Sequence, residues 1–106
     1  NLRAQRKFLI AGDMLELGLD APRYHRELGR LIADCALTTV VTVGPLAALA
    51  GAAAVKECSS PLNWISCNTP QEAAQALKPS LCSGDVVLLK ASRSIHLEKC
   101  VEILSA

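Results

Sequence analysis

The chain has 106 residues, of which 51% are hydrophobic and only 3% aromatic, and it carries 11 Lys and Arg against 10 Asp and Glu. A length in this range is typical of a single domain, here residues 1–106, with a core of Leu, Val, Ile and Ala. The balanced charge provides no field that would attract nucleic acid or a membrane surface, so we expect neither as a partner.

Four short apolar segments predict β-strands. Two of them, Thr39–Val43 and Val86–Lys90, are β-branched or continuously apolar, as is typical of strands that are covered on both faces. The other two are Phe8–Ala11 and Asn63–Ser66.

A helical pattern follows the first strand. Residues Pro22–Leu37 predict an amphipathic helix, and the spacing of the apolar side chains assigns five of them to its buried face: Tyr24, Leu28, Leu31, Ile32 and Cys35. A lone histidine such as His25 is usually exposed or half-buried, and no nucleophile stands beside it in sequence, so the pattern gives it no catalytic role. His96 is equally isolated.

The stretch 36–55 contains no charged residue and is long enough to cross a membrane. Gly44-Pro45 interrupts it near its middle, and the alanines that dominate its second half contribute little to membrane insertion. We therefore interpret it as the second strand followed by an alanine-rich helix, Leu46–Val55, which Pro45 opens.

Two further helices are predicted. Thr69-Pro70-Gln71-Glu72 is a capping box with proline in the first turn, and it begins a helix that runs to about Leu81. Ile95–Leu104 has the pattern of a closing amphipathic helix. The alternation of strand and helix predicts an α/β fold, a Rossmann-like three-layer sandwich with a mostly parallel sheet and helices on both faces.

The five cysteines contain no C-x-x-C pair, and the two histidines are far apart, so no zinc site is expected. We interpret the cysteines as buried thiols of a cytoplasmic protein, in preference to disulfides. They are Cys35, Cys58, Cys67, Cys82 and Cys100.

Ligands of such sheets bind outside the carboxyl ends of the strands. The first strand is followed by Gly12 and Asp13, with Glu16 close behind. Two interpretations stay open: the glycine supplies an unusual backbone angle while the aspartate caps nearby amides, or this loop faces a ligand.

The fourth strand ends at Lys90, and Ser92 and Arg93 follow it. The guanidinium fork and the lysine charge suit a carboxylate or a phosphate, although both cations would equally pair with an acid such as Glu98 or face water. The chain lacks the G-x-G-x-x-G and G-x-x-x-x-G-K-[ST] phosphate motifs. We therefore expect no catalytic residue and no metal ligand in this chain alone.

Four blocks of sequence carry a family resemblance: GDMLELG, YHRELGRLIA, VVTVGPLA and SGDVVLLKASRSIHLEKCVEIL. In this order they resemble the C-terminal domain of the Mur ligases, and most of all the members whose typical patterns are G-D-M-x-E-L-G, H-x-x-x-G and G-D-x-V-L-x-K-G-S-R. The matching residues are Gly12, Asp13, Met14, Glu16, Leu17, Gly18, His25, Gly29, Gly84, Asp85, Val87, Leu88, Lys90, Ser92 and Arg93. Ala91 and Ser94 replace two family glycines, which puts the conformation of that loop in question.

The resemblance is strongest to the members that join D-alanyl-D-alanine to UDP-N-acetylmuramoyl-tripeptide in bacterial peptidoglycan precursor synthesis. It implies that the chain is one domain of a three-domain enzyme, short of its own first strand and helix. ATP and Mg²⁺ would serve the whole enzyme, and this domain alone would hold neither. Its partners would be D-alanyl-D-alanine and two domains of the same chain, a central ATP-binding domain and an N-terminal UDP-substrate domain.

The resemblance also implies which residues face substrate or nucleotide: Gly12, Asp13, Met14, Glu16, His25, Lys90, Ser92 and Arg93. Lys90 and Arg93 would hold the dipeptide carboxylate or a nucleotide phosphate, and Met14, Leu15 and Leu17 would pack the first loop down. Two alternatives are a Mur ligase that adds a single amino acid and a non-catalytic α/β binding module of the same fold.

Overall fold

The computed structural model describes residues 6–92 and 95–105, without the side chain of Glu16. The described residues contain four strands: β1 (Lys7–Gly12), β2 (Thr39–Val43), β3 (Asn63–Cys67) and β4 (Val86–Lys90). They also contain four α-helices: α1 (Ala21–Ala33), α2 (Pro45–Glu57), α3 (Pro70–Leu77) and α4 (Glu98–Leu104). Two 3₁₀ segments, η1 (Leu15–Asp20) and η2 (Lys78–Ser80), complete the list.

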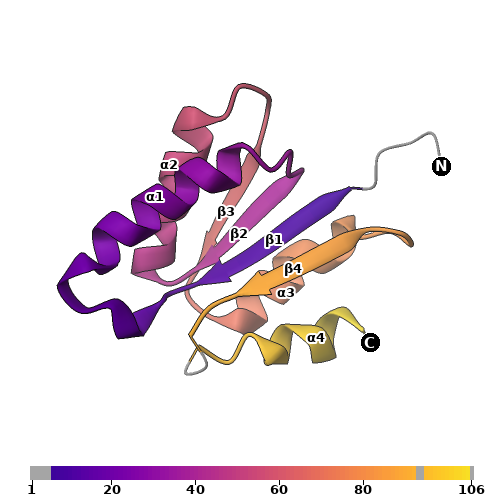
Figure 1. The fold of residues 1–106 in the computed structure, drawn as a ribbon. Helices are drawn as coiled ribbons and strands as arrows, with labels where there is room; N and C mark the ends of the chain where they lie inside the picture. The colour runs from indigo at the N-terminus through magenta and orange to yellow at the C-terminus, as the bar shows by residue number, and fades with distance from the viewer. Residues whose placement is uncertain (1–5, 93–94, 106) are drawn as a thin grey trace.

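The strands form one sheet in the order β3-β2-β1-β4, and every pair in it is parallel. Figure 1 shows α1 and α2 on one face of this sheet and α3 and α4 on the other. The core is divided accordingly: Leu9 and Ala11 of β1 pack toward α1 and α2, whereas Phe8 and Ile10 pack toward α3 and α4. The predicted Rossmann-like three-layer fold is confirmed.

The first helix differs from its prediction in length and in the face that it buries. It ends at Ala33, and its buried residues are Ala21, His25, Gly29 and Ile32. Leu31 is 65% exposed and Cys35 is exposed, so the predicted buried face was wrong for both. The reason is the close approach of α2, because a Cβ on Gly29 would lie 2.3 Å from the Ala50 carbonyl oxygen. Only the side of α1 with small residues fits there.

The capping box of α3 is confirmed, since the Thr69 hydroxyl accepts from the Glu72 amide at 3.1 Å. This helix ends at Leu77 and not near Leu81, because Pro79 has no N–H to donate to the preceding turn. The last helix begins at Glu98 and not at Ile95, because His96 has a φ of 60°, which a right-handed helix does not tolerate.

The cysteine prediction was only partly right. Cys67 and Cys100 are buried, and burial raises the pKa of both thiols. Cys58 is half-buried, whereas Cys35 and Cys82 are exposed because they lie in turns beyond the ends of the regular elements.

The uncharged stretch 36–55 forms β2 and most of α2, as predicted. No helix in the described part of the chain is long and apolar enough to cross a membrane.

An ion pair at the surface connects the residue before β1 to the turn before β4. The Arg6 guanidinium donates to both carboxylate oxygens of Asp85, at 3.1 and 2.7 Å, and also to the Ser80 carbonyl at 2.7 Å. The Cys82 amide donates to the same carboxylate at 2.8 Å. These interactions, first of all the hydrogen bond from Arg6, hold the pKa of the Asp85 carboxyl below its ordinary value.

This pair predicts a stability difference that depends on pH. A depressed pKa in the folded state stabilises the fold above the unfolded pKa of about 4, and the contribution disappears as pH falls through the folded value. Asp85→Asn should therefore lower the free energy of unfolding at neutral pH. The difference in this free energy between the variant and the parent chain should disappear in acid. Urea titrations across that pH range measure both. The exposed Asp34→Asn is the control, and a gap for Asp85→Asn that persists below the folded pKa would contradict the account.

Candidate functional site at the carboxyl edge of β1 and β4

The order β3-β2-β1-β4 creates a topological switch point between β1 and β4, where ligands of open α/β sheets bind. Ala11 of β1 is in register with Lys90 of β4, so the loops that follow the two strands leave the sheet side by side. The ends of the two strands and the loops after them hold all of the candidate residues that the structure describes, except His25.

Asp13 caps the helix that follows β2. Its side chain is buried, and its Oδ1 accepts from the Ala47 amide, in the first turn of α2, at 2.6 Å. Gly44 makes this possible: it has a φ of 107°, and a Cβ there would lie 2.6 Å from the Asp13 carboxylate. A carboxylate at the amino end of a helix satisfies an orphan amide and interacts favourably with the helix dipole. The capping interpretation is thus correct for Asp13, although the capped helix is distant in sequence. It was wrong for Gly12, which belongs to β1 and does not have a positive φ.

His25 holds the same loop from the side of α1. It is completely buried; its Nε2 accepts from the Met14 amide at 3.0 Å, and its Nδ1 lies 2.6 Å from the Ala21 carbonyl. Because an amide can only donate, Nε2 must be the bare nitrogen, and Nδ1 then donates to Ala21. The neutral ring is therefore a positioning group. The expectation of an exposed or half-buried histidine was wrong, and the spacing of Ala21, His25 and Gly29 on one helix face was the available signal.

Ser92 ties the two loops together. Its hydroxyl accepts from the Leu15 amide at 2.8 Å, and its own amide donates to the Asp13 carbonyl at 3.1 Å. Gly12 allows this approach, because a Cβ there would lie 2.7 Å from that of Ala91. The methyl group of Ala91, where the family has glycine, thus fits against a glycine of the neighbouring strand.

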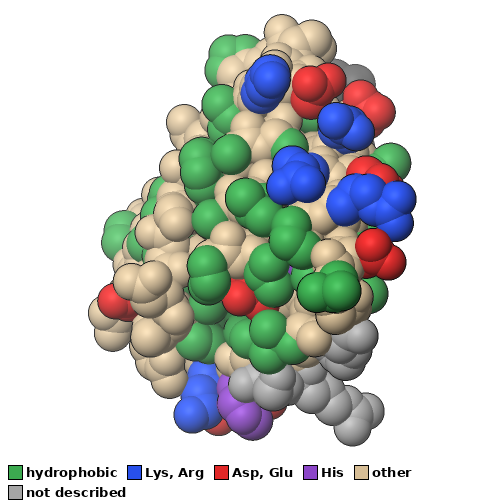
Figure 2. Space-filling model, turned by 90° about the vertical axis from the view of Figure 1, so that its left-hand side faces the viewer, with side chains coloured by type: hydrophobic (Ala, Val, Ile, Leu, Met, Phe, Trp, Pro, Cys, Tyr) green, Lys and Arg blue, Asp and Glu red, His purple; other side chains and the backbone are tan. Residues whose placement is uncertain are grey.

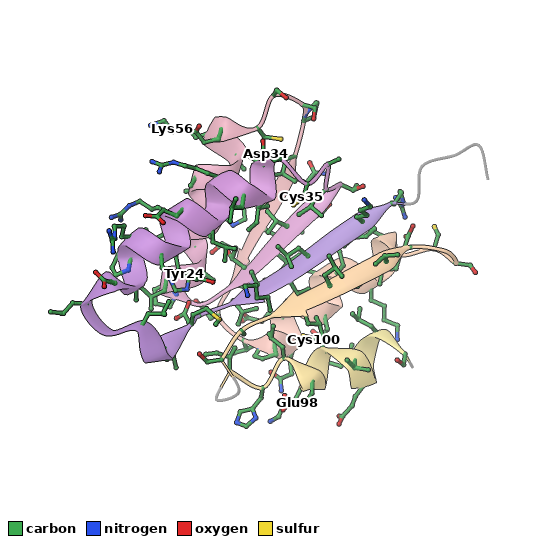
Figure 3. All side chains as sticks on the ribbon, viewed as in Figure 1. Tyr24, Asp34, Cys35, Lys56, Glu98 and Cys100 are labelled. Atoms are coloured by element: carbon green, nitrogen blue, oxygen red, sulfur yellow. The ribbon has the colours of Figure 1, made fainter. Side chains whose placement is uncertain are left out.

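Lys90 is placed differently from these buried groups. It is exposed at the end of β4, and it lines a shallow hollow of about 280 Å³ together with Leu89, Leu97, Glu98 and Val101. It makes no ion pair with any residue that the structure describes. Glu98, labelled at the start of α4 in Figure 3, instead lies 3.4 Å from His96. Lys90 is therefore available to bind an anionic group.

The remaining candidates complete the loop. Met14 and Leu17 are half-buried, as expected, but Leu15 is half exposed and Leu19 is fully exposed, so the loop is not packed down along its whole length. The backbone of Glu16 lies in η1, while its side chain and all of Arg93 are outside the described residues.

Neither the magnesium ion nor the ATP of the implied enzyme finds a complete site here. No three His, Cys, Asp or Glu side chains in the described residues are grouped to hold a metal ion, and the Asp13 carboxylate is engaged by α2. The Lys90 ammonium would be available to pair with a phosphate group.

Comparison with known proteins identifies the family of this chain. The family model described as "Mur ligase, glutamate ligase domain" matches residues 1–93. The chain belongs to the Mur ligase family. It corresponds to the C-terminal domain, and the Mur ligases are ATP-dependent amide ligases.

Two curated relatives are UDP-N-acetylmuramoyl-tripeptide–D-alanyl-D-alanine ligases. The one from Bacillus subtilis is 36% identical over 93% of this chain, and the one from Mycobacterium leprae is 33% identical over 95%. The matches cover 21% and 20% of those proteins, so the chain spans about one fifth of their length.

Solved structures agree with these matches. The MurF ligase of Thermotoga maritima, crystallised with ADP, superposes with a TM-score of 0.72 at 29% identity, and MurF of Acinetobacter baumannii with 0.75 at 26%. They cover 95% and 96% of this Mur ligase domain, which in turn covers 22% of each of those chains.

The Asp13 cap can be tested by substitution. Asp13→Ala should lower the free energy of unfolding by about 1–2 kcal/mol, because the Ala47 amide loses its acceptor. Asp13→Asn keeps an acceptor oxygen and should cost less. Urea unfolding measures both, with the exposed Asp34→Ala as the control. If Asp13→Ala and Asp13→Asn lowered the free energy of unfolding equally, or if neither lowered it, the cap would be excluded as the stabilising role of Asp13.

Proposed function

We propose that this chain is the C-terminal domain of a three-domain, cytoplasmic bacterial ligase that joins D-alanyl-D-alanine to UDP-N-acetylmuramoyl-tripeptide. The observation that carries the proposal is the family membership, together with two relatives of that activity matched over more than nine tenths of this chain. The supporting geometry is a hydrogen-bonded loop at the switch point, with Lys90, which makes no ion pair with the described residues, beside it.

In the proposed reaction, the tripeptide carboxylate takes the γ-phosphoryl group of ATP and releases ADP. The amine of D-alanyl-D-alanine then attacks the acyl phosphate, an amide bond forms, and inorganic phosphate leaves. Such a transfer depends mainly on positioning and on neutralisation of charge. Lys90 and Arg93, which are three residues apart in the sequence, would bind the dipeptide carboxylate or a nucleotide phosphate, while the hydrogen-bonded loop 13–15 fixes the wall of the site.

Exposed apolar side chains support a contact with another domain at this edge. Leu15 is 50% exposed and Leu19 fully exposed, and both lie beside the candidate site. Closure of a neighbouring domain onto them would bury this surface and exclude water from the reacting groups.

An exposed apolar side chain on β4 supports the proposal that a further strand and helix precede β1. Leu88 of β4 is in register with Leu9, so it faces the side of α1 and α2, yet it is 50% exposed because those helices do not reach β4. Parallel sheets are normally covered on both faces. A preceding strand at the free edge of β4, joined to β1 by a right-handed crossover, would place its helix over Leu88.

The assay uses the complete protein encoded by the native gene. We expect phosphate release from ATP only when UDP-N-acetylmuramoyl-tripeptide and D-alanyl-D-alanine are both present. Release with a single amino acid in place of the dipeptide would favour another Mur ligase activity. A gene without an upstream G-K-T/S phosphate loop, encoding a protein with no activity, would favour a non-catalytic module.

The cations of the site make a separate prediction. Arg93→Ala and Lys90→Ala should raise the KM for ATP or for the dipeptide, because each removes a contact to an anionic group, while Lys99→Ala on α4 should leave both constants unchanged. Steady-state kinetics with each substrate varied in turn measures this. Unchanged KM values for both substrates in both variants would remove these residues from the site.

A further inference from the structure

The outward side of α2 is unusual for a surface helix. From Pro45 to Val55 the helix carries no polar side chain, yet only one side of it is buried by the sheet and α1. Helices that are apolar all round are normally buried on all sides. Figure 2, which faces the side of the molecule formed by α1 and α2, shows hydrophobic side chains gathered across its middle.

A hollow of about 240 Å³ lies between this helix and α1. Leu49, Ala52 and Ala53 of α2 provide its apolar lining. The small alanine side chains would allow the backbone of a partner helix to approach closely.

Three cations surround the hollow: Arg26 and Arg30 from α1 and Lys56 from α2. Lys56 is labelled near the end of α2 in Figure 3. None of the three makes an ion pair or a side-chain hydrogen bond with the described residues, although Glu57 also lines the hollow. Three cations against one carboxylate leave an excess of positive charge around an apolar floor.

We propose that this surface, the α1–α2 hollow, binds an amphipathic helix of another protein that carries acidic residues beside an apolar stripe. The apolar stripe would cover Leu49 and Ala52, and the carboxylates would pair with Arg26, Arg30 and Lys56. The hollow lies toward the amino ends of the strands, because Arg30 and Lys56 are near the ends of helices that begin at the carboxyl edge. A partner there leaves the candidate site accessible, so the proposal does not depend on the ligase function.

Two other occupants are less compatible with these observations. A lipid surface is bound mainly by large protruding side chains, whereas this floor is concave and built on alanine, which contributes little to insertion. Single-stranded nucleic acid requires aromatic stacking platforms, and no aromatic side chain lines the hollow.

The test is a titration of the 106-residue chain with two synthetic amphipathic helices that share one leucine stripe, one flanked by glutamates and the other by lysines. The acidic peptide should bind, more weakly at high ionic strength, and the basic one should not. Arg30→Glu and Ala52→Glu should each weaken binding of the acidic peptide by about tenfold or more. Lys99→Glu, on the opposite face of the sheet, is the matched control, and circular dichroism verifies the fold of each variant.

Three results would overturn the proposal. They are equal binding of the acidic and basic peptides, unchanged affinity in both hollow variants, and binding of phosphatidylglycerol vesicles by the chain when the acidic peptide does not bind. The last result would assign the surface to a membrane.

Discussion

The hydrogen bond from the Ala47 amide to the Asp13 carboxylate is the contact on which the candidate site depends. It joins the end of β1 to the start of α2 and thereby fixes the turn that leaves the sheet at the switch point. The backbone amide of Met14 donates to His25 of α1, and that of Leu15 donates to Ser92, which follows β4. A loop at a binding edge, which would otherwise be mobile, is thus held by three different parts of the fold.

This arrangement divides the polar residues of the family motif into two kinds. Asp13, His25 and Ser92 are buried, and their side chains accept hydrogen bonds from backbone amides, so they hold the loop in position. Lys90 is exposed and makes no ion pair in the described chain, so it is able to contact a ligand directly. Substitutions of the first kind should affect stability and geometry together, whereas substitution of Lys90 should affect binding alone.

Local sequence patterns were sufficient for the elements and for one cap. β-branched runs predicted β2 and β4, and the Thr69–Glu72 capping box predicted the start of α3, because these signals act over a few residues. The site depends on long-range contacts: Asp13 and Ala47 are 34 residues apart, and Leu15 and Ser92 are 77 apart. The buried face of α1 was misjudged for a related reason, since the close approach of α2 selects Gly29 over Leu31.

Amide hydrogen exchange measured by NMR tests the three-point attachment most directly. If Asp13, His25 and Ser92 bind the loop as described, the amides of Ala47, Met14 and Leu15 should exchange as slowly as those within β1, although none of the three lies in a strand or in the interior of a helix. Exchange as fast as that of the exposed Ser59 and Ser60 would show that the loop is not held, and would contradict the account of the site.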